Sequence, residues 1–295
     1  MVAPINAFAF ERSHPATDPY EGWRLAVQAW SFNRFSFFES LDKAYALGLD
    51  WIEAYPDQAL SPDHPEIKFN HNLAPQYRSM VKQKLHELGI RIISYGVVNL
   101  PGDEAECRKV FDFARDFGID CVNAEPDEND LDMIETLCRE YQVKLGIHDH
   151  PKPSHYWNPD TVLAACKGRS HWIGACADTG HWVRSGLDPL ECLKKLAGRI
   201  NTLHFKEIDS TATSMHDVVW GTAQKRTPEL LKELHRQGFR GTFSIEYEYD
   251  WDNNMPEIAG CIDFFRRVSG RLAGGAGWGP LLAPDLSNTD FKAGS

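Results

Sequence analysis

The strongest constraint on the fold is an alternation of strand-like and helix-like segments that repeats eight times between residues 23 and 268. The strand-like segments are apolar and rich in β-branched residues, as is typical of parallel strands buried on both faces. Each is followed by a segment with helical punctuation, and several of these end at a glycine, such as Gly48, Gly89 and Gly118. Eight such units in about 250 residues predict a closed (β/α)8 barrel of the α/β class.

The segment boundaries follow from the apolar patterns and from turn residues. Predicted strands cover 24–32, 51–55, 90–100, 120–126, 143–151, 173–178, 200–208 and 241–249, and predicted helices cover 37–47, 73–88, 103–117, 131–141, 159–166, 189–196, 228–236 and 255–268. An open doubly wound sheet would need a glycine-rich phosphate loop after its first strand, and none is present there. We therefore predict a single-domain TIM barrel over residues 23–270, an irregular N-terminal extension over 1–22, and a flexible C-terminal tail or linker over 271–295.

Composition excludes several classes of function. The net charge of -11 argues against binding a nucleic-acid backbone, which requires a basic surface. No apolar run is long enough to span a membrane. Seven cysteines without a CxxC pair indicate reduced, buried thiols. The first residues lack a basic region and an apolar core, which favours a cytoplasmic protein, or a periplasmic one if a signal peptide has been removed. The sequence is compatible with a homo-oligomer and does not specify one.

Four successive predicted strands in the second half carry a metal-binding side chain at nearly the same depth: His148, Asp178, His204 and Glu246. A lone histidine in a strand is usually a core or surface residue. Parallel barrel strands, however, end at one mouth, so equal depth places four such side chains around one point. Two imidazoles and two carboxylates can hold one divalent metal ion (Mn, Zn, Co or Mg) and leave positions open for substrate.

The same argument from depth predicts which residues of the other four strands lie at the mouth. It places Glu125 on the fourth strand, and Trp30, Tyr55 and Tyr95 on the first three. An aromatic wall that faces a cation-centred polar wall suits a carbohydrate, because a sugar ring has an apolar face and a hydroxyl edge. We therefore predict these three aromatic residues as substrate-binding, although a one-residue slip of a strand would turn its side chain away.

Further candidates lie beside the proposed ligands. His150 follows His148 by two residues, so both point the same way, and it can be a ligand, a substrate contact or a proton donor. His181, one loop beyond Asp178, is a candidate for substrate binding or acid–base work. Glu248 shares a face with Glu246 and is a candidate for supporting the metal site or for proton transfer.

Two charged neighbours follow His204. We predict Lys206 as a catalytic candidate and Glu207 as a substrate contact, with a plain ion pair between them as the alternative. The acidic segment 127–130, which follows Glu125, is expected to be a solvated turn.

Three motifs carry a resemblance to a known family: Asp178-Thr-Gly-His181, His204-Phe-Lys-Glu207 and Ser244-Ile-Glu-Tyr-Glu248. With these motifs the chain resembles, over roughly residues 23–270, the xylose isomerase-like barrel superfamily. That superfamily holds sugar isomerases and epimerases, inosose-processing enzymes and the endonuclease IV branch. The resemblance implies that Asp178, His204 and Glu246 are metal ligands.

The chain departs from the family on its fifth strand. The sugar epimerases of the family carry there a glutamate that binds the metal and moves a proton, whereas this strand carries His148 and His150. Glu125, on the adjacent strand, is the candidate replacement. Residues 284–295 resemble the lead-in to a lectin-like β-sandwich domain of 3-keto-disaccharide-processing proteins, which implies an appended domain of that kind.

These observations favour a divalent-metal-dependent sugar isomerase or epimerase that removes a proton next to a metal-polarised carbonyl, through an enediolate. Candidate bases are Glu246, Glu125 and Glu248, with His150 or His181 as the proton donor. A 3-keto-glycoside β-eliminating lyase or hydratase is the alternative. A DNA repair nuclease of the endonuclease IV type is a remote alternative, because strands two and three lack the histidines of a trinuclear zinc cluster. A sugar-binding module without catalysis would not require four aligned ligands.

Overall fold

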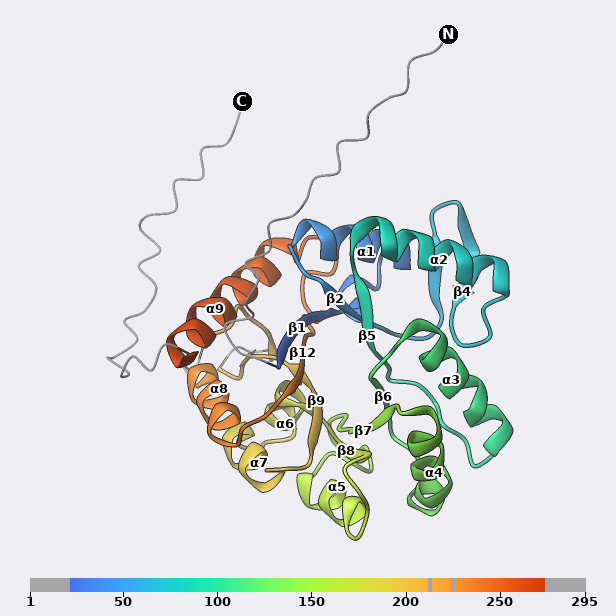
Figure 1. Cartoon of the computed structure of the whole chain (residues 1–295). Coiled ribbons are helices and arrows are strands. Elements are labelled where there is room, and N and C mark those ends of the chain that lie inside the picture. The colour runs from blue at the N-terminus through green and yellow to red at the C-terminus, as the bar shows by residue number, and fades with distance from the viewer. Residues whose placement is uncertain (1–21, 212–213, 224–225, 274–295) are drawn as a thin grey trace, which may run out of the picture.

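The computed structural model describes residues 22–211, 214–223 and 226–273. Eight parallel strands form a closed barrel in the order β1-β12-β9-β8-β7-β6-β5-β2, and helices surround it (Figure 1). The predicted TIM barrel is therefore confirmed. The barrel strands are β1 (Trp23–Gln28), β2 (Trp51–Ala54), β5 (Arg91–Tyr95), β6 (Cys121–Ala124), β7 (Lys144–His148), β8 (Ile173–Asp178), β9 (Ile200–Phe205) and β12 (Gly241–Ile245).

The helices lie close to where the sequence predicts them. Asp103 begins one by accepting hydrogen bonds from the backbone of Ala105 and Glu106, and Gly118 ends the same helix with a φ of 66°. The tail predicted after residue 270 falls mostly on residues 274–295, which lie outside the described part. The same holds for the extension predicted over 1–22, apart from Gly22. The helices are α1 (Phe37–Ala46), α2 (Pro75–Leu88), α3 (Glu104–Phe117), α4 (Leu131–Tyr141), α5 (Pro159–Cys166), α7 (Pro189–Lys195), α8 (Thr227–Arg236) and α9 (Met255–Ala273).

Apart from β8, which has its predicted bounds, the barrel strands are shorter than predicted, and short elements replace the ends of several of them. The first strand ends at Gln28, whose side chain accepts a hydrogen bond from the backbone of Trp30 and starts the 3-10 helix η1 (Ala29–Phe32). A hairpin of β3 (Gln58–Ser61) and β4 (His64–Phe69) lies between β2 and α2, where no strand is predicted. The unpredicted elements also include η2 (Glu128–Asp130), α6 (Thr179–Arg184), β10 (Ile208–Asp209) and β11 (His216–Asp217).

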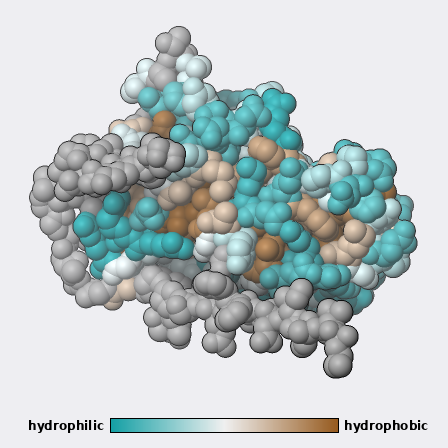
Figure 2. Space-filling view, turned by 90° about the horizontal axis from the view of Figure 1, so that it is seen from above, coloured by the Kyte–Doolittle hydropathy of each residue, from teal (hydrophilic) through white to brown (hydrophobic). Residues whose placement is uncertain are grey.

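The main apolar core lies between the barrel and its helices. Phe37 of α1 stacks on Phe69 of β4 with ring centroids 3.9 Å apart, which explains how the hairpin is fastened to the barrel. On the face seen in Figure 2, hydrophilic residues surround smaller apolar areas. None of the helices within residues 22–211, 214–223 and 226–273 is both long enough and apolar enough to cross a membrane.

The inside of the barrel is polar below the mouth. Glu53 of β2 is fully buried there, and it accepts hydrogen bonds from Asn123 Nδ2 at 2.7 Å and from Ser244 Oγ at 2.5 Å. Gly146 of β7 makes room for this group, because a Cβ atom at that position would lie 2.3 Å from Asn123 Oδ1. Three strands therefore meet through one buried carboxylate directly under the mouth.

Candidate metal centre at the mouth of the barrel

The four predicted ligand residues come together at the carboxyl ends of β7, β8, β9 and β12. His148 Nε2 lies 3.8 Å from Asp178 Oδ2, and His204 Nδ1 lies 3.9 Å from the same oxygen. Glu246 Oε2 lies 3.0 Å from His204 Nδ1. All four residues are buried. Since metal–ligand bonds are about 2.0–2.2 Å long, ligand atoms of one ion lie about 3–4 Å apart, as these do.

Three of these ligand atoms lack a hydrogen-bond partner among the described residues: His148 Nε2, Asp178 Oδ2 and His204 Nδ1. A buried polar atom without a partner is costly, and a cluster of them needs an explanation. Both nitrogens lie within 4 Å of Asp178 Oδ2, and two imidazole nitrogens with a carboxylate oxygen are a donor set that divalent transition metals accept. The residues present therefore fit a metal ion. Asp178, His204 and Glu246 also form one of the groups able to hold an ion.

Each imidazole has a carboxylate behind it. His148 Nδ1 lies 3.2 Å from Glu125 Oε1, and His204 Nε2 lies 2.9 Å from Glu53 Oε1. A carboxylate in this position holds the ring proton and leaves the other nitrogen free for a metal. Sequence reasoning missed Glu53, whose only signal was an acidic residue within a short apolar strand. It placed Glu125 at the mouth, where the structure shows it supporting both His148 and the neighbouring histidine.

Asp178 is held in place from two sides. Its Oδ1 accepts hydrogen bonds from the backbone of Gly180 at 2.9 Å and His181 at 2.8 Å, which caps α6. Its backbone amide donates to Asp149 Oδ1 at 2.8 Å. Burial, together with the negative charge of Asp178, raises the pKa of Asp149 well above its usual range. Asp178 Oδ2 is thereby left facing the mouth.

Glu125 is surrounded by donors and is not a free base. It accepts a hydrogen bond from Ser154 Oγ at 2.6 Å and from the backbone of His150 at 3.1 Å, and it contacts His150 Nδ1. Burial opposes ionisation of Glu125, but the hydrogen bonds from His148, His150 and Ser154 outweigh it and hold the Glu125 pKa far below its usual range. Glu125 is therefore held as a carboxylate by three hydrogen-bond partners.

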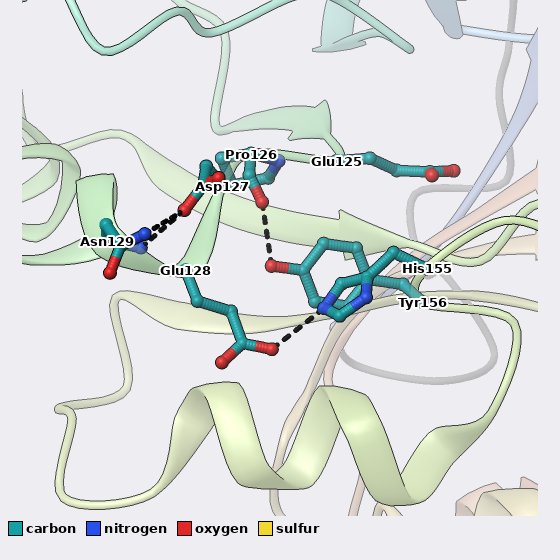
Figure 3. Close-up of a pocket in the computed structure, with 7 residues that line it drawn as sticks. All are labelled: Glu125, Pro126, Asp127, Glu128, Asn129, His155 and Tyr156. Carbon is teal, nitrogen blue, oxygen red and sulfur yellow. Dashed lines mark hydrogen bonds and ion pairs between the residues drawn. The ribbon is translucent and has the colours of Figure 1, made fainter.

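His150 is the half-exposed member of this group, with 49% of its side chain accessible. Burial lowers the pKa of His150, but the hydrogen bond and the charge of Glu125 outweigh it and raise that pKa above the ordinary value. In Figure 3 the Glu125 side chain extends away from the acidic segment that follows it. That segment is a capped turn, in which Asp127 accepts a hydrogen bond from the backbone of Asn129 at 2.9 Å.

His181 presents a proton to the mouth. Its Nδ1 lies 3.1 Å from an Arg184 guanidinium nitrogen, and its Nε2 lies 3.5 Å from Asp178 Oδ2. Because a guanidinium can only donate, Nδ1 accepts and the ring proton sits on Nε2. Burial lowers the pKa of His181 to about 2, which keeps the ring neutral. Arg184 is itself anchored by Asp217 Oδ2 at 2.8 Å.

Lys206 points into the centre and does not pair with Glu207. Its Nζ lies 3.0 Å from Asp178 Oδ2, 2.8 Å from Glu246 Oε2 and 2.8 Å from Glu248 Oε2. Burial disfavours the ammonium form, but these carboxylates outweigh it and raise the pKa of Lys206 well above its usual value. Lys206 therefore remains a buried cation among three carboxylates.

Gly180 gives Lys206 the space to reach them. A Cβ atom at Gly180 would lie 2.8 Å from both Lys206 Cβ and Lys206 Cδ. We expect Gly180→Ala to displace Lys206 and to lower the free energy of unfolding by about 1–3 kcal/mol, the usual cost of overpacking. Denaturant titration measures this change. Gly270→Ala is the control, because nothing lies within 4 Å of its Cβ position. Equal unfolding energies in the two variants would contradict the close contact.

Two predicted substrate contacts face away from the mouth. Glu207 accepts hydrogen bonds from the backbone of Ala223 at 3.0 Å and from Gly221 and Thr227, so it fastens the loop before α8. Tyr95 is fully buried and packs on Phe113 of α3, with ring centroids 5.0 Å apart. In both places the alternation of side chains along the chain decides which residue points into the barrel. The residue beside each, Lys206 in one place and Ser94 in the other, takes the inward position.

The other predicted aromatic residues do line a pocket at the mouth. Trp30 and Tyr55 meet edge to face at 5.0 Å, and Trp251, from the loop after β12, lies 6.3 Å from Trp30. Trp251 was not predicted from the sequence. Because β12, β1 and β2 are neighbours in the barrel, these rings gather on one side of the mouth. The pocket is lined by Trp30, Asn33, Arg34, Tyr55, Pro56, Asp57 and Trp251.

Comparison with known proteins assigns the family. The family model described as xylose isomerase-like TIM barrel matches residues 41–268. The chain belongs to this family. A putative uncharacterized protein from Parabacteroides distasonis is similar at 35% identity, with 84% of this chain and 99% of that chain covered and a TM-score of 0.69. A search of functionally curated proteins finds no match.

More distant solved structures share the barrel fold. An L-ribulose 3-epimerase is 17% identical, with a TM-score of 0.61 and coverage of 85% of this chain and 96% of that chain. A probable 3-DHS dehydratase from Bacillus anthracis is 15% identical, with a TM-score of 0.62 and coverage of 82% and 98%. At these identities the likeness concerns the fold alone.

Proposed function

We propose that this protein is a divalent-metal-dependent enzyme that isomerises or epimerises a sugar by removing a proton next to a carbonyl. The observation that carries the proposal is the convergence on Asp178 Oδ2 of two buried imidazole nitrogens without a hydrogen-bond partner, His148 Nε2 and His204 Nδ1. Family membership supports it, and so do the names of structures with the same fold, which include an epimerase and a probable dehydratase.

In this proposal His148, Asp178, His204 and Glu246 hold the ion. When bound, a divalent cation polarises a carbonyl and the neighbouring hydroxyl of a substrate. The chain itself fixes the ligand orientation, since Glu125 and Glu53 hold the outer nitrogens of the two imidazoles. Lys206 adds a fixed positive charge beside Glu246, where negative charge that develops on a substrate is stabilised.

His150 is the proposed general base. Its Nδ1 contacts Glu125, which leaves Nε2 as the free basic nitrogen, and the ring is half exposed. The other candidate bases are already occupied, because Glu246 Oε2 and Glu248 Oε2 both lie 2.8 Å from the Lys206 ammonium. A base oriented by a third group is a recurring arrangement in general-base catalysis. His181, with its proton on Nε2, is the proposed donor to a substrate oxygen.

The aromatic pocket is the proposed sugar-binding wall. Trp30 is 41% exposed and, with Tyr55 and Trp251, offers ring faces to the apolar side of a sugar. Arg34 and Asp57, in the same pocket, offer charged groups to hydroxyls. The predicted wall thus loses Tyr95 and gains Trp251.

β-Elimination from a 3-keto-glycoside, or the reverse hydration, is the second candidate. The observation that favours it is that the Glu125 carboxylate is already engaged by His148, His150 and Ser154. Epimerisation by two carboxylates would need this group free to move a proton. Elimination needs one base to remove the proton and one donor to protonate the leaving oxygen, and His150 and His181 supply these.

Metal removal tests the proposal directly. The protein is stripped with a chelator, reloaded separately with Mn, Zn, Co or Mg, and incubated in deuterated water with simple ketoses or with 3-keto-glycosides. We expect deuterium next to the carbonyl, or release of the eliminated alcohol, only with metal present, because proton removal depends on a polarised carbonyl. NMR detects both outcomes and separates isomerisation from elimination. Equal reaction in the stripped and reloaded protein would contradict the proposal.

A further inference from the structure

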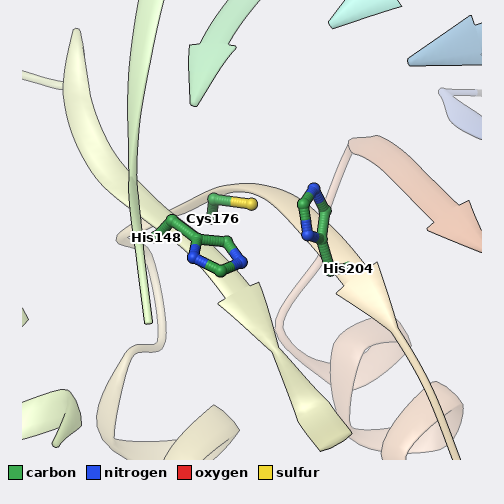
Figure 4. A group of neighbouring side chains, drawn as sticks. All are labelled: His148, Cys176 and His204. Carbon is green, nitrogen blue, oxygen red and sulfur yellow. The ribbon is translucent and has the colours of Figure 1, made fainter. Parts of the chain in front are cut away.

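Cys176 lies on a barrel strand, and its side chain points into the barrel interior beside the candidate metal ligands. It precedes Asp178 by two residues on β8, so both side chains point to the barrel interior. The strand register places it directly beside His148 of β7. Figure 4 shows its sulfur and the rings of His148 and His204 turned toward a common space, from three adjacent strands. Its side chain is fully buried.

The geometry around this thiol is that of a ligand group. One potential ligand atom each from His148, Cys176 and His204 lie within 4.8 Å of one another. His148 and His204 also each carry a buried nitrogen without a hydrogen-bond partner, Nε2 and Nδ1 respectively, which points to a ligand in this part of the mouth. Both residues are only 1% exposed, so bulk water does not satisfy these atoms.

We propose that Cys176 is itself a ligand of the metal at this centre, and that it makes the centre selective for thiophilic ions. This rests on the proposed metal-dependent function. Thiolate and imidazole ligands suit Zn²⁺ and Co²⁺, whereas Mg²⁺ and Mn²⁺ prefer oxygen. On binding, the S–H bond of Cys176 breaks, a sulfur–metal bond forms, and the proton leaves to solvent.

The other cysteines provide the contrast. Within the described part of the chain, Cys176 is the only cysteine that belongs to a group able to hold a metal. Cys121 also lies in a barrel strand, but its sulfur contacts Asn123 Oδ1 at 3.5 Å. Cys138 is fully buried in the apolar core on α4. It therefore serves as a matched control that loses a buried thiol without a neighbouring imidazole.

Cobalt spectroscopy tests the assignment without relying on turnover. Metal-free wild-type protein, Cys176→Ala, Cys176→Ser and Cys138→Ala are titrated with Co²⁺. We expect a sulfur-to-cobalt charge-transfer band in the near ultraviolet for the wild type and Cys138→Ala. Both Cys176 variants should lose this band and keep the visible cobalt bands. Their Zn²⁺ affinity should fall by about 10- to 100-fold, with Mn²⁺ affinity unchanged.

The outcomes separate this inference from the function on which it rests. Visible cobalt bands without a charge-transfer band in the wild type would overturn the thiolate ligand and leave the metal centre standing. An equal loss of Zn²⁺ affinity in Cys138→Ala would also overturn it. Failure of the wild type to bind Co²⁺, Zn²⁺ and Mn²⁺ would overturn the metal-dependent function itself. Loss of the charge-transfer band in both Cys176→Ala and Cys176→Ser, with the visible cobalt bands kept in both, shows that the loss does not come from misfolding of one variant.

Discussion

Replacing His204 with alanine is expected to remove both the bound divalent ion and all measurable turnover. The His204 ring connects the buried carboxylate of Glu53, 2.9 Å from its Nε2, with the proposed ligand Glu246, 3.0 Å from its Nδ1. Its loss deletes one ligand and also leaves Glu53 without this partner in the barrel interior. A hydrogen bond to a charged group contributes about 1.5–3 kcal/mol, so we also expect a lower free energy of unfolding, although Asn123 and Ser244 still donate to Glu53.

Metal analysis after dialysis, steady-state assay and denaturant titration measure these three effects on one sample. His86→Ala is the control, because His86 is an exposed histidine in the last turn of α2. We expect it to match the wild type in all three measurements. A folded His204→Ala protein that still binds one equivalent of metal would show that His204 is not a ligand. Retained turnover without metal would contradict the proposed chemistry as well.

The sequence predicts the barrel because its strongest signals are local ones. Eight apolar strands, separated by capped helices, are visible as patterns of nearby residues. The hairpin of β3 and β4 is not visible in this way, because its stability depends on Phe69 packing against Phe37, a contact between distant residues. The first strand ends early at Gln28 because one side-chain hydrogen bond favours a 3-10 turn over four further extended residues.

The proposed ligands were predictable for a geometric reason. Similar depth on parallel strands places side chains at one mouth. Asp178 and His204 are register partners, while His148 pairs with Cys176, two residues before Asp178, and still reaches to 3.8 Å from Asp178 Oδ2. The rule fails where a strand is one residue shorter or shifted, since alternation then turns the side chain to the other face. Tyr95 shows the failure. The register of β2 and β5 shifts between Ile52 and Glu53, and Ser94 takes the inward position.

The supporting residues were not predictable, because their roles depend on pairs that are distant in sequence. Glu53 and His204 are 151 residues apart, yet their side chains are in contact. Trp251 joins Trp30 only because the last barrel strand lies beside the first. Glu125 was placed correctly at the mouth, but the sequence does not show its three partners there, His148, His150 and Ser154.

Replacing His150 with glutamine is expected to lower turnover by about 10²- to 10⁴-fold, the usual contribution of a general acid or base. Glutamine keeps a donor for Glu125 and has a similar size, but it cannot accept a proton at neutral pH. The bound metal should stay at the wild-type level, because His148 retains its contact with Glu125. Turnover and metal content measured on one preparation therefore separate proton transfer from metal binding.

His155→Gln is the matched control, because His155 is an exposed histidine on the same loop that pairs with Glu128 at 2.8 Å, outside the metal centre. We expect its turnover to equal that of the wild type. Glu125→Gln completes the comparison, since it acts through two histidines and should reduce both metal affinity and turnover. A His150→Gln enzyme with wild-type turnover would return the role of base to Glu246 or Glu248. Both of these carboxylates lie 2.8 Å from the Lys206 ammonium, so that result would require Lys206 to move away from one of them during the reaction.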